Sequence, residues 1–185
     1  LVRGLGVARA ASLVYGTLTR ISAEGDAEDD TRWRLDYSRA GHLPPILLRD
    51  GSATQLAQGA GALVGFGNRA RTVGTVELRP GDSVVLYTDG LIERRDRGLR
   101  EGLMALLEVA GSSVASDAAG IGEELVSALA ERPEDDVAVV VVRLPSRRRA
   151  GGPADGPRSR RWSLPSDPAS IARARQALLR TVQAW

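Results

Sequence analysis

The chain has 185 residues, of which 43% are hydrophobic, so it is long and apolar enough to bury the core of one globular domain. It contains no cysteine, which excludes disulfides, thiolate metal sites and cysteine nucleophiles and fits a reducing, cytoplasmic setting. The formal net charge is only +2, and no apolar run reaches the roughly 18 residues that cross a bilayer, so we expect no membrane partner.

The first part of the chain has the pattern of β-strands. Residues 12–21 and 33–38 alternate or are rich in β-formers, and the acidic stretch 23–30 between them predicts a long, solvated hairpin loop. Residues 46–49 lead into Asp50-Gly51, which is a strong turn signal. These segments predict the first strands of a sheet.

A further pair of strands is predicted on either side of a turn at residues 79–82. Residues 73–78 alternate in polarity, and residues 83–88 form an apolar, β-branched run that we expect to be buried on both faces. The leucine spacing in residues 101–110 predicts a helix, with Met104 as a core filler.

A second helix and a last strand complete this region. Asp117 is a candidate N-cap for a helix with Ile121 and Leu125 on its apolar face. Residues 137–142 are almost entirely valine, and we expect a buried, central strand there. Hairpins followed by helices and a last central strand predict an α+β domain built in layers.

The stretch 145–161 is rich in arginine, glycine and proline and has no apolar periodicity, so it predicts a flexible linker. It divides the chain into a domain over residues 1–144 and the beginning of another over residues 162–185. This basic linker could contact nucleic acid. However, the chain has arginine but no lysine, which indicates a coding bias, and we expect no nucleic-acid partner.

Two acidic positions carry the candidate chemistry. Asp89 follows the strand at 83–88 and precedes Gly90, while Asp135 and Asp136 precede the strand at 137–142. If the two strands are neighbours, their carboxylates converge, and clustered carboxylates are normally stabilised by a cation. Oxygen ligands favour Mg²⁺ or Mn²⁺. From spacing alone, a simple turn at the first position and a solvated strand start at the second remain the favoured interpretation.

Three further polar residues could join a site but have plainer explanations. His42, the only histidine, lies between Gly41 and two prolines, where fixing a turn is favoured over catalysis. Arg94 and Arg95 could meet a phosphate, although a solvated turn is favoured for them.

Three separated motifs resemble the protein phosphatase 2C (PPM) family, most closely its bacterial sporulation stage II E branch. They are SRAGHLPPILLRDG at 38–51, LRPGDSVVLYTDGLIE at 78–93 and EDDVAVVVVR at 134–143, within a resemblance that covers roughly residues 8–144. The resemblance implies a sandwich of two antiparallel sheets flanked by helices, holding two Mn²⁺ or Mg²⁺ ions. It also implies metal-dependent dephosphorylation of phosphoserine or phosphothreonine in regulatory proteins such as anti-anti-sigma factors.

The motif match assigns metal-binding roles to particular residues. Asp89 and Asp135 would be metal ligands, Gly90 would let the backbone approach the site, and Asp136 is the weaker candidate ligand. No catalytic side chain beyond the metal ligands is implied. The family's first metal motifs would lie upstream of Leu1, so we expect an N-terminally truncated domain that is inactive by itself. A degenerate, non-catalytic module that binds a sigma-factor regulator is the alternative.

The tail at residues 162–185 resembles the first strand and helix of an ATPase domain of the anti-sigma-factor kinase type. This implies the start of a second domain, although no nucleotide motif is present in the tail. An amphipathic helix that docks on the phosphatase is the alternative. The oligomeric state and the individual substrate are left open by the sequence.

Overall fold

The computed structural model describes residues 10–21, 32–66, 70–130 and 135–144, together with Gln176 and Arg180. Contacts divide the chain into one unit of residues 11–148 and another of residues 1–10 and 149–185. The predicted linker at 145–161 and nearly all of the ATPase-like tail at 162–185 lie outside the described residues. The domain boundary and the second domain therefore remain predictions.

The elements of the unit 11–148 follow the predicted order. In chain order they are β1 (Leu13–Arg20), β2 (Trp33–Ala40), β3 (Ile46–Arg49), β4 (Ser52–Gln55), β5 (Ala60–Gly61), β6 (Gly74–Leu78), β7 (Ser83–Tyr87), the 3-10 helix η2 (Asp89–Leu91), α2 (Leu99–Ser112), α3 (Ala118–Leu129) and β8 (Val139–Arg143). The predicted strands and both helices are confirmed, with ends shifted by a few residues, and the fold is α+β. Strand β4, which follows the predicted turn, the short strand β5 and the helix η2 were not predicted.

The first sheet is formed around β2. Strand β1 pairs with β2 in an antiparallel hairpin from Leu13 and Ala40 to Arg20 and Trp33, as the acidic loop between them predicts. Strand β6 pairs antiparallel with the same strand, whereas β5 pairs with it in parallel over two residues. The short parallel pairing of β5 makes this sheet mixed, while its other pairs are antiparallel, as the resemblance implies.

The second sheet has the strand order β4-β3-β7-β8 with antiparallel neighbours. Its first hairpin turns at Asp50 and Gly51, whose φ angles are 50° and 72°. Positive φ at both central residues is the signature of a type I′ turn, and its twist matches the paired strands. The predicted turn is confirmed, and it pairs Arg49 with Ser52.

The predicted pair of strands around residues 79–82 is not a hairpin, because β6 and β7 belong to different sheets. Leu78 at the end of β6 and Val84 on β7 are both buried in one cluster between the sheets, together with Tyr37 and Leu47. Packing β6 and β7 face to face across this core buries both apolar faces, which edge-to-edge pairing would leave without a cover.

The last strand differs from its predicted burial. Strand β8 lies at one end of the strand order and pairs with β7, so within the described residues it is an edge strand and not a central one. Val139 and Val141 pack against the helical side, whereas Val140 and Val142 are 56% and 42% exposed. A run of valines is compatible with burial on one face or on two, and the neighbouring elements decide which occurs.

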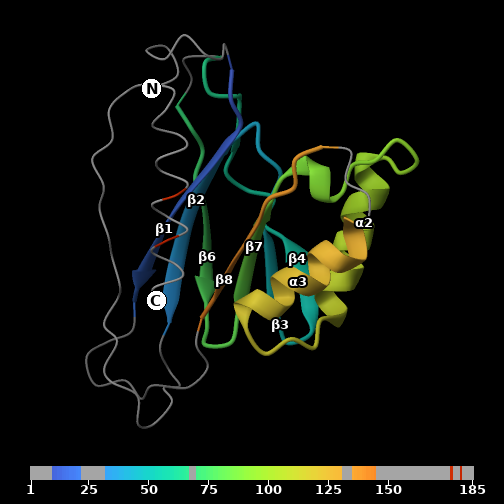
Figure 1. Ribbon diagram of the computed structural model, residues 1–185. Coiled ribbons are helices and arrows are strands. Elements are labelled where there is room, and N and C mark those ends of the chain that lie inside the picture. Colours follow the sequence, from blue (N-terminus) through green and yellow to red (C-terminus); the bar gives the residue numbers. More distant parts are fainter. Residues whose placement is uncertain are drawn as a thin grey trace. The chain divides into compact units, whose positions relative to one another are not determined.

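Helices α2 and α3 cover the face of the second sheet that is turned away from the first sheet (Figure 1). Leu106, Ile121 and Leu125 are buried there in one cluster with residues of β3 and β7. Asp117 caps α3 by accepting from the Gly120 N–H at 2.8 Å, as predicted. Met104 is 62% exposed, so its prediction as a core residue was wrong: it points away from the sheet that Leu106 faces. None of the helices in the described residues has the length and apolarity to cross a bilayer.

Candidate metal centre

Asp89 lies where β7 ends and the chain turns sharply. Thr88 is still extended, with φ −88° and ψ 161°, and Asp89 begins the 3-10 helix η2. The carbonyl of Asp89 accepts from the N–H groups of Ile92 and Glu93, both at 2.8 Å. The side chain of Asp89 is exposed, so this turn carries the carboxylate out of the core and into solvent.

Asp135 and Asp136 lie at the same end of the sheet. They precede β8, and because β8 runs antiparallel to β7, the start of one strand meets the end of the other at the pair Tyr87 and Val139. A Cβ added to Gly90 would lie 2.6 Å from the Asp136 carbonyl oxygen and 3.0 Å from that of Asp135. The structure therefore brings the two predicted acidic segments together, with Gly90 in direct backbone contact.

The carboxylates of Asp89 and Asp135 make only local hydrogen bonds among the described residues. Asp89 Oδ1 accepts from the Gly90 N–H at 3.0 Å, and Asp135 Oδ1 accepts from the Asp136 N–H at 2.7 Å. Both side chains are exposed, and neither forms an ion pair with a described arginine. Exposed carboxylate oxygens of this kind suit Mg²⁺ or Mn²⁺.

The donor set found at this end of the sheet is partial. Over the described ranges, no group of three or more histidine, cysteine, aspartate or glutamate side chains is placed to hold a metal ion. The described carboxylates are of the chemical type that a hard cation binds, but by themselves they do not form a metal site. Further oxygen ligands are needed to complete its coordination, since Mg²⁺ takes six.

Thr88 is a residue of this junction that the sequence interpretation missed. Its hydroxyl donates to the Asp136 carbonyl at 2.9 Å and accepts from the Ala138 N–H at 2.9 Å, so one side chain joins the two acidic segments. The available signal was a hydroxyl residue between a buried strand and an Asp-Gly pair. That signal could not identify the partners, which lie 48 and 50 residues further along the chain.

The motif around His42 is held by an arginine. The guanidinium of Arg39 donates to the carbonyls of His42, Ala57 and Gln58 at 2.9, 2.6 and 3.0 Å. The His42 Nδ1 lies 3.2 Å from the carbonyl oxygen of Leu43. These contacts fix the path of the chain between the sheets and agree with the turn role favoured for His42.

Two charged or polar groups near Asp89 have structural roles of their own. Arg94 forms an ion pair with Asp96 at 3.0 Å within the loop that follows η2, as expected for a solvated turn. Burial raises the pKa of Tyr87 to about 12, so its phenol remains neutral and adds no charge beside the acidic segments.

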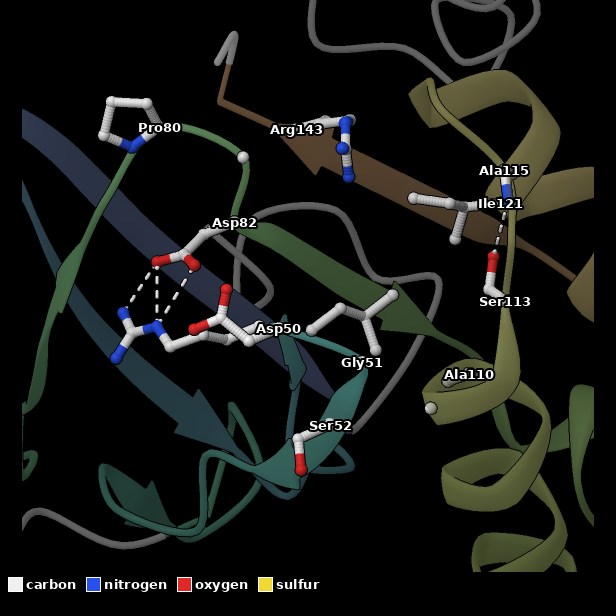
Figure 2. A pocket seen from close by; sticks show the side chains of 14 residues that line it. Asp50, Gly51, Ser52, Pro80, Asp82, Ala110, Ser113, Ala115, Ile121 and Arg143 are labelled. Carbon is white, nitrogen blue, oxygen red and sulfur yellow. Dashed lines mark hydrogen bonds and ion pairs between the residues drawn. The ribbon is translucent and has the colours of Figure 1, made fainter. Parts of the chain in front are cut away.

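The opposite end of the second sheet contains a polar cavity of about 310 Å³, shown in Figure 2. It lies between the turns at Asp50-Gly51 and Pro80-Gly81 and the segment that joins α2 to α3. On one wall, Asp82 is paired with Arg49 at 2.6 Å and also accepts from the Arg79 N–H at 2.8 Å. The side-chain hydrogen bond to Asp82 raises the pKa of Arg49 above its usual value.

Arg143 points into the same cavity from the end of β8 (Figure 2). Its guanidinium donates to the Ser83 hydroxyl at 3.0 Å, and Ser83 is fully buried. The polar groups of this cavity thus bind mainly to one another and tie the turns and strand ends together. The candidate chemistry remains at the Asp89 end.

Comparisons with known proteins show which family and which solved structures the chain is similar to. The family model described as Stage II sporulation protein E (SpoIIE) matches residues 5–145. The solved structure of the RsbU and RsbW domains of Rv1364c from Mycobacterium tuberculosis is similar at 31% identity with a TM-score of 0.53. That match covers 62% of this chain and 34% of the other, so the chain spans about a third of the length of the mycobacterial protein.

Other solved structures are similar at lower identity. The manganese-presoaked phosphatase domain of SpoIIE from Bacillus subtilis has 18% identity and a TM-score of 0.47, covering 72% of this chain and 58% of that one. The catalytic domain of the serine/threonine protein phosphatase PstP, in complex with two manganese ions, has 20% identity and a TM-score of 0.42. The match covers 61% of this chain and 59% of that one.

Proposed function

The chain belongs to the SpoIIE family of PP2C-type phosphatase domains. We propose that it takes part in metal-dependent dephosphorylation of phosphoserine or phosphothreonine in proteins. Asp89 and Asp135 are the proposed metal ligands contributed by these residues. Asp136 is the weaker candidate, and Gly90 gives the close backbone approach. The observation that carries the proposal is the meeting of two exposed acidic segments at one sheet end, across Gly90.

The chemistry of the ligands supports Mn²⁺ or Mg²⁺, with two ions in the complete domain. When bound, such ions act as Lewis acids that lower the pKa of water and neutralise charge on a phosphoryl group. The proposed role of this chain is to hold carboxylates at one end of the sheet, beside the last pair of β7 and β8, Tyr87 and Val139. The remaining ligands are proposed to be water molecules and residues outside the described ranges.

The proposed substrate is a phosphorylated regulatory protein of the anti-anti-sigma type. Support comes from family membership and from the 31% identity to a structure whose name includes an RsbU domain. We propose a cytoplasmic location for this reaction, in keeping with the absence of cysteine. The tail at 162–185 is proposed to begin an ATPase domain of the anti-sigma-factor kinase type, as its sequence resemblance suggests.

The test is phosphate release from a phosphoserine protein substrate by the complete protein as Mn²⁺ is titrated. Asp89→Asn is expected to lower kcat/KM by about 100-fold or more, because a neutral amide replaces a charged ligand of the cation. Asp96→Asn is the matched control. It removes an exposed carboxylate from the adjacent loop, where that carboxylate pairs only with Arg94 among the described residues, and is expected to retain activity.

Two outcomes would contradict the proposal. Full activity in Asp89→Asn would remove this residue from the metal site. Substrate binding by the wild-type complete protein without any Mn²⁺-dependent phosphate release would favour the degenerate binding module instead.

A further inference from the structure

Thr88 makes four hydrogen bonds at the point where β7 ends. Its N–H donates to the Ala138 carbonyl at 3.0 Å, as in an ordinary antiparallel ladder. Its hydroxyl accepts from the Ala138 N–H and donates to the Asp136 carbonyl, both at 2.9 Å. Its carbonyl accepts from the Leu91 N–H at 3.1 Å.

This pattern departs from a regular strand pair in one respect. In a hydrogen-bonded antiparallel pair, two opposite residues exchange both of their backbone bonds. Here the hydroxyl of Thr88 takes the place of its own carbonyl as the acceptor for Ala138, and the carbonyl is free to close the first turn of η2. The chain can therefore leave the sheet at Asp89 while Thr88, just after β7, remains bound to Ala138, just before β8.

The same hydroxyl also acts beyond the ladder. By donating to the Asp136 carbonyl, it holds the backbone that follows Asp135 against the turn that begins at Asp89. Gly90 makes this approach possible, because any Cβ there would meet the two carbonyl oxygens of that backbone. Thr88 thus links the two segments by a hydrogen bond, and the absence of a side chain at Gly90 allows their backbones to come into contact.

We propose that Thr88 is a positioning residue whose hydroxyl holds the segments of Asp89 and Asp135 together for binding of a divalent cation. This inference rests on the proposed function, since it assigns the two aspartates to one metal site. It adds a residue that does not contact the metal itself and acts through backbone groups. Residues that orient metal ligands in this way typically change metal affinity by about 10–100-fold when they are replaced.

The experiment compares Thr88→Val and Thr88→Ser in the complete protein by calorimetric titration with Mn²⁺. Valine keeps the branched shape and removes the hydroxyl, so we expect the Kd for Mn²⁺ to rise by about 10-fold or more. Serine keeps the hydroxyl and is expected to stay within about threefold of wild type. Activity lost in Thr88→Val is expected to return at high Mn²⁺ concentration.

Thr72→Val is the matched control. Its hydroxyl donates to the Ala60 carbonyl at 2.7 Å beside the first sheet, so the same chemical change is made away from the acidic segments. We expect the Mn²⁺ affinity of this variant to equal that of wild type. Wild-type affinity in Thr88→Val, or an equal loss in Thr88→Val and Thr72→Val, would overturn the positioning role.

A measurement on the wild-type protein keeps the inference testable even if Thr88→Val does not fold. Amide hydrogen exchange is expected to protect the Ala138 N–H as strongly as the β7–β8 ladder, although Ala138 is exposed. Fast exchange at this amide would contradict the inference directly. Absence of Mn²⁺ binding in the wild-type complete protein would instead count against the proposed function.

Discussion

The two ends of the second sheet use aspartate in opposite ways. At one end, Asp82 is 4% exposed and its carboxylate is bound by Arg49 and by the Arg79 N–H. At the other end, Asp89 and Asp135 are exposed and bind only the neighbouring amide within the described residues. Loss of a buried, paired carboxylate leaves its partners unpaired and lowers stability, whereas an exposed and weakly bound carboxylate remains available to a ligand.

The largest expected effect is a loss of stability when Asp82, the buried aspartate at the cavity end of the second sheet, is replaced. Asp82→Asn should lower the free energy of unfolding by about 3 kcal/mol, because it leaves Arg49 without its charge partner in a mostly buried setting. Asp89→Asn should change the same quantity by no more than about 0.5 kcal/mol, as surface substitutions usually do. Chemical unfolding of the complete protein in EDTA measures both. Equal losses would erase the distinction between the two ends.

Gly90→Ala changes the residue at which the two acidic segments approach each other. The added Cβ would meet the Asp136 carbonyl oxygen at 2.6 Å, so the backbone of the two acidic segments must separate. We expect a stability loss of about 1–3 kcal/mol from overpacking, together with weaker Mn²⁺ binding. Thermal unfolding and Mn²⁺ titration test the two effects separately. Unchanged metal affinity would indicate that the close approach of these segments is irrelevant to binding.

Gly51→Ala is the corresponding change at the cavity end. Gly51 has a φ of +72° and nothing within 4 Å of an added Cβ, so its cost is backbone strain without a steric clash. We expect a loss of about 1–2 kcal/mol in stability and no change in Mn²⁺ affinity. If this variant weakened metal binding as much as Gly90→Ala, the two ends of the sheet would be coupled.

The smallest effect is expected at Asp36 on β2, a partly exposed carboxylate that does have a partner. The hydroxyl of Thr75, at 2.7 Å, is the main reason that the pKa of Asp36 is lowered, with Arg34 also contributing. A lowered pKa in the folded state stabilises the fold above the ordinary value of 3.8, and this stabilisation is lost as the pH falls through the folded-state pKa.

Thr75→Val should therefore raise the pKa of Asp36 and weaken the acid-dependent part of stability. The titration of the Asp36 carboxyl carbon by NMR measures this change. A pKa that stays where it is in the wild type would show that Arg34 alone is responsible.

Much of the fold could be predicted because its signals are local. The β-branched run that became β7, the N-cap at Asp117 and the type I′ turn at Asp50-Gly51 each depend on residues a few positions apart. The positions of Asp89 and Asp135 at strand ends could also be predicted from neighbouring residues. Their convergence was conditional on β7 and β8 being neighbours, which no local pattern states.

Which faces of the strands and helices contact one another is visible only in the tertiary structure. It placed β6 and β7 in different sheets, made β8 an edge strand within the described residues and left Met104 in solvent. It also gave Thr88 partners that follow about 50 residues later in the chain. The physical reason is that sequence patterns record the polarity and backbone preference of each residue, whereas strand partners are selected by the burial of whole faces against one another.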